Sequence, residues 1–259
     1  MSRDWKLIAV PLIAALVGGC ATTPPGVEIG RSPWAEESRL AGAAVEPRGP
    51  WHHQAFPGKK RTTFSYARKD GRHAVRAQSA ASASALRQRL HVPPHALGQL
   101  RFSWWVPALI EQADMRLRDA DDSPVRVVLV FEGDRSRLSP RNAMLSELAQ
   151  AVTGEPLPYA TLMYVWSNQR PVGDVIVNPR TDRIRKLVVQ SGGDKLKHWL
   201  DYERDIRSDF ERVFGEPPGA LVGLGLMTDS DNTGAHTQAW YGPVKLSTSR
   251  GTEAEGGTF

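Results

Sequence analysis

One acidic stretch holds the residues whose types and spacing are best suited to chemistry. In "LMTDSDNTG" (226–234), Asp229, Asp231 and Thr233 stand at alternate positions directly after an apolar run. Carboxylates that follow a buried strand can attack phosphorus, hold a metal ion, or form the turn of a hairpin. The surrounding sequence has to decide among these three possibilities.

The phosphatase interpretation requires elements that the chain lacks. Asp229-x-Asp231-x-Thr233 resembles the loop of haloacid-dehalogenase-like hydrolases, in which the first aspartate is a magnesium-assisted nucleophile. That loop opens its fold, and its lysine and further acids come from later strands. Here only residues 234–259 follow, with one clear strand. This chemistry is therefore not expected.

A calcium loop of the helix–loop–helix type is excluded as well. Such a loop requires a bidentate glutamate at its twelfth position, where this sequence has Trp240, and strands are expected on both sides. A looser calcium site remains open, because "RDADDSP" (118–124) supplies more acids before the run "VRVVLVF". If the two runs are neighbouring strands, the loops meet around a cation or an arginine; otherwise both are solvated turns. The candidate calcium ligands are Asp121, Asp122, Asp229, Asp231 and Asn232.

Other catalytic signatures are absent from the sequence. It contains no G-x-S-x-G, no H-E-x-x-H and no phosphate-binding glycine loop. The acidic pair Asp201 and Glu203 could serve a glycosidase, although such pairs are usually just solvated. The enzyme alternative is thus a metal-dependent hydrolase of glycans or phosphoesters that uses the acidic loops. No catalytic residue is assigned.

Tryptophans suggest a binding function more directly than the acids do. Several of the eight lie in expected strands, and in an alternating strand one of two adjacent residues faces outwards. An exposed indole beside arginine and aspartate can stack on a sugar ring, although packing in the core is the commoner role of any single tryptophan. Trp105, next to Arg101 and Ser103 on the polar face, is the best candidate for exposure. The candidate ligand-binding residues are Trp105, Trp166, Arg185 and Glu203.

Short strands predominate from about residue 61 onward. The segments with strand patterns are "TTFSYAR" and "HAVRAQS" around the turn "KDGR", then "LGQLRFSWWV", "VRVVLVF", "YATLMYVW", "DVIV", "IRKLVVQ", "LVGLGLM" and "AWYGPVKL". With only two helical insertions among them, they predict a mostly antiparallel β-sandwich.

Two segments are expected to be helical. One begins at the N-cap Ser139 and ends at Gly154, with an apolar stripe of Leu145, Leu148, Ala149 and Val152. The other lies within residues 195–215, where Ile206, Phe210, Val213 and Phe214 share a face and Gly215 ends the helix. Its first part, residues 199–203, is compatible with a helix or a strand.

The N-terminal segment has the pattern of a bacterial lipoprotein signal. Arg3 and Lys6 precede eleven mainly apolar residues, and "VGGC" places the single cysteine, Cys20, where a lipidated first residue would stand. Ala21, rather than aspartate, favours the outer membrane. We therefore expect a signal peptide at 1–19, a flexible tether at 20–57, a β-sandwich at 58–248 and a disordered tail at 249–259.

Several of these segments together resemble a known bacterial family. "LRFSWWV", "DADDSPVRVVLVF", "YVW", "TDRIRKLVVQSG", "ERDIRSDFERVFGEPP" and "LVGLGLMTDSDNTGAHTQAWYGPVKL" resemble, in order, the domain of unknown function 3047 over roughly residues 60–247. The resemblance implies secreted or lipid-anchored proteins and a galactose-binding-like jelly roll. Two features depart from the family pattern, namely Trp240 and an enlarged loop at 136–153.

The expected function is that of a lipid-anchored envelope protein at the outer membrane, facing the periplasm. We expect a non-catalytic binding or structural module, with a cell-envelope glycan as its ligand, calcium as the one candidate cofactor, and the membrane as a partner through the lipid. The net charge of +5 would suit an anionic surface, but nucleic acid is not expected on the far side of a secretory signal.

Overall fold

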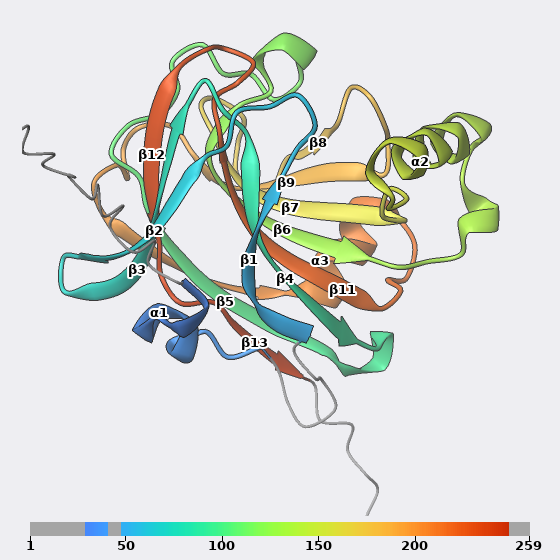
Figure 1. Ribbon diagram of the computed structural model, residues 1–259, viewed down its shortest axis with the longest axis horizontal. Coiled ribbons are helices and arrows are strands. Elements are labelled where there is room, and N and C mark those ends of the chain that lie inside the picture. Colours follow the sequence, from blue (N-terminus) through green and yellow to red (C-terminus); the bar gives the residue numbers. More distant parts are fainter. Residues whose placement is uncertain (1–28, 41–47, 249–259) are drawn as a thin grey trace, which may run out of the picture.

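Strands with alternating apolar residues build two β-sheets in the computed structural model, which describes residues 29–40 and 48–248 (Figure 1). The seven-stranded sheet has, in spatial order, β1 (Arg48–Ala55), β4 (Ser84–Val92), β11 (Leu221–Asp229), β6 (Ser123–Phe131), β7 (Ala160–Ser167), β9 (Ile184–Ser191) and β8 (Val175–Val177). The six-stranded sheet has β10 (Trp199–Asp205), β5 (Leu97–Trp105), β12 (His236–Tyr241), β3 (Arg72–Ala80) and β2 (Thr63–Lys69), with β13 (Lys245–Thr248) also paired to β5.

The predicted antiparallel β-sandwich of the jelly-roll type is confirmed. Among the strand pairs of the described residues, only β7 and β9 run parallel. The inner faces of the two sheets enclose one apolar core, in which Phe102 of β5 stacks on Tyr164 of β7 with ring centroids 5.5 Å apart. Trp104, Trp166 and Phe131 are among the largest side chains that are fully buried there.

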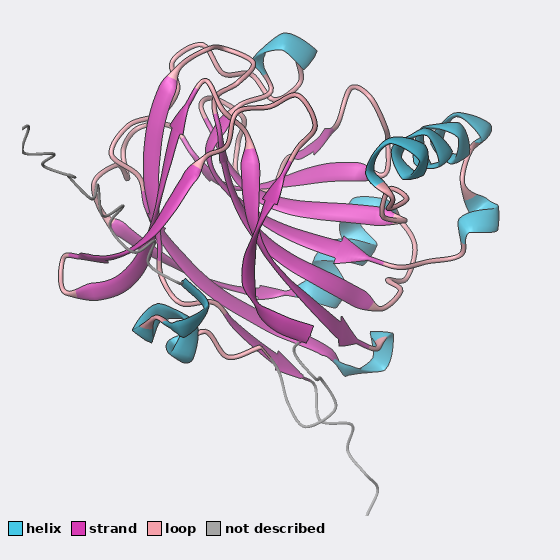
Figure 2. Ribbon diagram, in the orientation of Figure 1, coloured by secondary structure: helices cyan, strands magenta, loops and turns pink. Residues whose placement is uncertain are grey.

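Two of the α-helices lie at the margins of the sheets, and the third, Ile206–Phe214, packs on the core behind the strands of the seven-stranded sheet (Figure 2). The α-helices are α1 (Pro33–Glu37), α2 (Pro140–Thr153) and α3 (Ile206–Phe214), and short 3-10 helices lie at Ile29–Arg31, Pro94–Ala96, Arg118–Ala120 and Arg135–Arg137. Ser139 and Gly154 cap α2 as predicted, and Gly215 ends α3. The segment that fitted either a helix or a strand is the strand β10.

The expected apolar stripe of α2 is wrong in part. Leu148 and Val152 are 60% and 66% exposed, whereas Asn142 and Ser146 are the residues that α2 buries. In α3, by contrast, Ile206, Phe210, Val213 and Phe214 are buried as expected.

The described part of the predicted tether is folded. β1 pairs with β4, and Ile29, Trp34 and Trp51 belong to the core. The indole rings of Trp34 and Trp51 lie 5.0 Å apart between their centroids. The tether prediction is therefore wrong for residues 29–40 and 48–57, because these aromatic residues bury apolar surface that a tether would expose. The predicted signal at 1–19, Cys20 and the tail at 249–259 lie outside the described residues.

Candidate functional site

The two acidic loops lie next to each other at one end of the seven-stranded sheet. β6 and β11 are antiparallel neighbours, and their register pairs Asp229 with Ser123. The backbone N–H of Ser123 donates to Asp229 Oδ1 at 3.1 Å. The backbone N–H and the hydroxyl of Thr233 donate to Asp122 Oδ2 at 2.7 and 2.6 Å. The strand order thus brings together two loops that are about a hundred residues apart in the chain.

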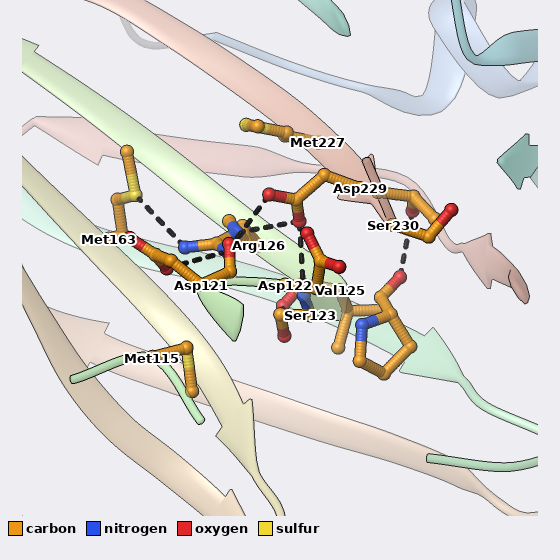
Figure 3. A network of polar contacts seen from close by, with 12 residues as sticks. Met115, Asp121, Asp122, Ser123, Val125, Arg126, Met163, Met227, Asp229 and Ser230 are labelled. Atoms are coloured by element: carbon orange, nitrogen blue, oxygen red, sulfur yellow. Dashed lines mark hydrogen bonds and ion pairs between the residues drawn. The ribbon is translucent and has the colours of Figure 1, made fainter. Parts of the chain in front are cut away.

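A buried arginine lies between these loops (Figure 3). Arg126 donates from Nε and Nη2 to the two carboxylate oxygens of Asp229, at 2.9 Å each, and from Nη2 to Asp121 Oδ1 at 3.1 Å. Lys186 Nζ lies 2.7 Å from both carboxylate oxygens of Asp121. Arg126 and Lys186 are only 2% and 1% exposed. Of the two expected partners for the loops, a cation or an arginine, the structure shows the arginine.

Burial and mutual charge set the pKa values in this cluster. Burial raises the pKa of Asp229 to about 6, against the opposing effect of Arg126. Burial, together with Arg126, lowers the pKa of Lys186 to about 8, and Asp121 opposes this. Burial also lowers the pKa of Arg126, but Asp229 and Asp121 outweigh it, so that the pKa of Arg126 rises. Arg126 therefore stays charged throughout the range in which Asp229 and Lys186 titrate.

Three of the predicted calcium ligands come close together. Asp122, Asp229 and Asp231 each offer a carboxylate oxygen, and these oxygens lie within 4.8 Å of one another. All three already accept protein donors, which for Asp231 is Lys59. Asn232 turns its amide nitrogen toward Asp122 Oδ1 and the carbonyl of Asp121. A calcium ion would have to displace such donors to gain the six to eight oxygens it prefers, and calcium binding stays a prediction.

The burial of two of these acids argues against the hydrolase alternative. Asp122 and Asp229 are 1% and 3% exposed, so a substrate reaches neither carboxylate in this conformation.

The four candidate ligand-binding residues are divided between the two sheets. Trp166 on β7 is 1% exposed, and its indole N–H donates to the carbonyl of Gly192 at 2.9 Å. Its ring presents no face to a ligand. Arg185 on β9 donates to the carbonyls of Asp182 and Val213 at 2.9 and 2.6 Å. Trp105 and Glu203 lie on the other sheet, on the neighbouring strands β5 and β10.

Trp105 faces away from the core, as its alternation with Trp104 predicts, but the expectation that it is exposed is wrong. Its side chain is 9% exposed because Lys69 lies over it, with Nζ 3.9 Å from the ring centroid, and because Trp240 packs edge-on at 5.1 Å. The buried indole nitrogen finds no hydrogen-bond partner among the described residues.

Trp105 is the centre of a row of three tryptophans. The register pairs it with Trp199 of β10 on one side and Trp240 of β12 on the other. These two outer rings are partly exposed. Arg72 lies 5.2 Å from the centroid of Trp199, and Arg76 lies 5.5 Å from that of Trp240. The outer face of the six-stranded sheet thus carries three tryptophans in register, which we call the tryptophan row (Trp199, Trp105 and Trp240), with cationic side chains above it.

A polar groove borders the tryptophan row. It has a volume of about 650 Å³, and Arg72 takes part in both features. Two exposed ion pairs line it: Arg72–Asp201 at 2.7 Å and Arg101–Glu203 at 2.9 Å. Glu203 is the one candidate ligand-binding residue that lines this groove.

A family model described as "Protein of unknown function (DUF3047)" matches residues 49–245. The chain belongs to this family. No curated protein matches the chain.

Among solved structures, this DUF3047 protein is similar to two glycan-active enzymes. One is the xyloglucanase domain of NopAA, a type three effector from Sinorhizobium fredii, with a TM-score of 0.31, 8% identity and coverage of 78% of this chain and 100% of that one. The other is endoglucanase 3 of Trichoderma harzianum, from family GH12, with a TM-score of 0.37, 6% identity and coverage of 79% and 96%. Likeness at this level carries no argument about the site.

Sequence reasoning missed two features of this DUF3047 chain. Arg126 lies in the run "VRVVLVF", which was assigned as a strand without a role for its arginine, although a charged residue in a buried strand is itself a sign of a buried ion pair. The tryptophan row was missed because it depends on strand pairing: Trp199 and Trp240 are 41 residues apart in sequence, the difference of their numbers.

None of the helices in residues 29–40 and 48–248 has the length and apolar character needed to cross a bilayer.

Proposed function

We propose that the protein is a non-catalytic glycan-binding module of the cell envelope and that the tryptophan row is its ligand platform. The observation that carries this proposal is the register of three indole rings across three adjacent strands, on the face opposite the core. A sugar ring packs its apolar face on an indole, and neighbouring charged groups bind its hydroxyls. Here the polar groove supplies such groups from Arg72, Asp201 and Glu203.

Trp199 and Trp240 are the expected contact residues, because their rings keep part of their surface exposed. Trp105 lies between them in the register, and its ring packs edge-on against that of Trp240. Lys69 covers Trp105 and is only partly exposed, so a long glycan would pass beside its ammonium group. The row is therefore suited to at least two sugar rings, one over each outer indole.

The test is a glycan array probed with residues 21–259, followed by calorimetry with any glycan that binds. We expect Trp199→Ala and Trp240→Ala each to weaken binding about tenfold or more, which corresponds to roughly 1.4 kcal/mol. Met144→Ala is the matched control, since Met144 is 61% exposed on the distant α2. An array without hits, or binding that neither tryptophan variant weakens, would contradict the proposal. Release of reducing sugar from a bound glycan would favour the hydrolase alternative instead.

We propose further that a lipid at Cys20 anchors the module to the outer membrane, facing the periplasm. The support for this is the lipoprotein pattern around the single cysteine. Labelled palmitate should enter the wild-type protein in bacterial cells and be absent from Cys20→Ala. Incorporation that persists in the variant would refute the anchor.

A further inference from the structure

The outer face of the seven-stranded sheet is hollowed into a trough, on the side of the sandwich away from the tryptophan row. The trough has a volume of about 570 Å³. Its floor is mainly apolar and includes Val128 and Val130 of β6, Met163 of β7 and Met227 of β11. Leu157 and Pro158, which follow α2, are among its lining residues. A space of this size and character is typical of sites for small molecules.

A glycine of β11, Gly225, lies in the lining of the trough. Gly223 and Gly225 alternate with Met227 on the outward face, in the middle of a strand, where glycine usually weakens a sheet. A Cβ at Gly225 would meet only ordinary contacts, 3.5 Å from the carbonyl oxygen of Leu86 and 3.7 Å from Val128 Cβ. Neither the backbone nor the packing therefore requires a glycine at position 225. What its missing side chain provides is room above the sheet.

An incompletely paired arginine lies in the trough. The Arg87 side chain is 17% exposed, and its Nε is buried with no hydrogen-bond partner among the described residues. Its Nη1 donates to Gln54 Oε1 at 3.3 Å and lies 3.8 Å from Glu155 Oε2. Glu155 also pairs with Arg89, so two guanidinium groups share one carboxylate. Burial, and then the charge of Arg89, lower the pKa of Arg87, which is the sign of a charge that its surroundings compensate poorly.

The charges along the trough have an excess of positive sign. Glu155 is the only acid among the lining residues, against the two arginines Arg87 and Arg89. At the opposite end the next outward residue of β6 is Arg126, whose Nη1 is 4.0 Å from Met163 Sδ. Since Arg126 already pairs with the carboxylates of Asp229 and Asp121, Arg87 is the group that would gain most from a bound anion.

We propose that this trough binds a single acyl chain with a carboxylate head, that is, a free long-chain fatty acid, whose carboxylate pairs with Arg87 and whose chain lies over Gly225. The volume holds on the order of 20 heavy atoms if each occupies about 30 Å³, the liquid volume of a water molecule. That is the size of one acyl chain with its carboxylate, and it is too small for a two-chain phospholipid. Each methylene that the apolar floor removes from water favours binding. The proposal is independent of the glycan site, which lies on the other sheet.

The direct test measures binding of hexadecanoate to the delipidated protein, residues 21–259, below the concentration at which the ligand forms micelles. Hexadecanol is the matched ligand, because it has the same chain without the charge. We expect saturable binding of one hexadecanoate per protein, and binding of hexadecanol at least about tenfold weaker. No binding, or equal binding of the two ligands, would overturn the proposal without the need for any variant.

Two variants locate the site. Arg87→Met keeps most of the side-chain volume and should abolish the preference for hexadecanoate over hexadecanol. Gly225→Leu should fill the trough and weaken both ligands, while the melting temperature shows that the variant is folded. Arg116→Met, at an exposed arginine outside the trough, is the control and should bind as the wild type does. Unchanged binding in Gly225→Leu, or binding only to vesicles of anionic phospholipid, would place the interaction elsewhere and refute the trough.

Discussion

At the scale of single residues, Arg126 holds the acidic loops together. Its guanidinium makes hydrogen bonds to Asp229 and Asp121 and is 2% exposed. Arg126→Met would leave the buried Asp229 carboxylate without its main partner, and we expect a loss of about 3–5 kcal/mol in the free energy of unfolding. Urea denaturation measures this.

The control for that variant is Arg116→Met. Arg116 is 55% exposed and pairs with Asp114 at 2.6 Å, and an exposed pair of this kind contributes less than about 1 kcal/mol. Similar losses in both variants would show that the buried cluster is not held by Arg126.

Asp229 and Asp231 should likewise differ in how much they contribute to the free energy of unfolding. Asp229→Asn removes the partner of a buried arginine, so we expect it to destabilise the fold by several kcal/mol. Asp231 pairs with the more exposed Lys59, and Asp231→Asn should cost about 1 kcal/mol or less. Melting curves with and without calcium complete the test. A rise in melting temperature with calcium that both variants lose would confirm the predicted calcium site.

At the scale of elements, β1 and α1 belong to the fold, although the sequence reads as a tether there. A chain of residues 58–259 would lose Ile29, Trp34 and Trp51 from the core and expose β4 as a new sheet edge. We expect it to melt far below a chain of residues 29–259, because losing one buried tryptophan typically costs about 3–5 kcal/mol. Equal melting temperatures of the two chains would contradict the placement of β1.

Helix α2 presents an apolar face to solvent. Met144, Leu148 and Val152 recur every fourth residue, and each is at least 60% exposed. We expect Leu148→Ser and Val152→Ser each to change the free energy of unfolding by about 0.5 kcal/mol or less. Phe210→Ala on α3 is the contrast, since Phe210 is fully buried and its truncation should cost about 3–5 kcal/mol. A large loss in either serine variant would show that this face of α2 is buried in solution and not exposed.

The elements show what the sequence could and could not predict. Local signals located α2 and α3, since Ser139, Gly154 and Gly215 cap them in the structure. The strand β4 was not predicted, because its inward-facing residues, which include Leu86 and Leu90, are interrupted by the polar but buried Gln88. Contacts that depend on the pairing of distant strands were not predicted, for a different reason. Lys69 covers Trp105 only because the sheet brings their strands together, and no spacing along the chain encodes that contact.

At the scale of the whole molecule, Tyr241 joins the two sheets. It lies on β12, yet its hydroxyl donates to the carbonyl of Met227 on β11 at 2.6 Å and accepts from the backbone N–H of Arg126 on β6 at 3.2 Å. Burial raises its pKa above the ordinary value for a phenol. Ionisation of this one group would therefore act on the packing of both sheets.

Four of the five tyrosines have a pKa that burial raises above the ordinary value for a phenol. Unfolding at alkaline pH is therefore a test of the whole sandwich. Burial raises the pKa of Tyr202 to about 12, that of Tyr164 well above the ordinary value, and those of Tyr159 and Tyr241 as well. Above about pH 10 an unfolded chain releases these protons while the folded protein keeps them, so stability is present below that pH and is lost as the pH rises.

An ultraviolet absorbance titration of phenolate, run in parallel with circular dichroism, measures this coupling. We expect most phenols to stay protonated up to about pH 11 and then to ionise together as the fold is lost, because each ionised phenol favours the unfolded chain. The same chain in urea is the control, and all its phenols should ionise near the ordinary value of about 10. If the folded protein titrated like the urea-unfolded chain while its circular dichroism persisted, the buried positions of these side chains, and with them the packing of one sheet on the other, would be wrong.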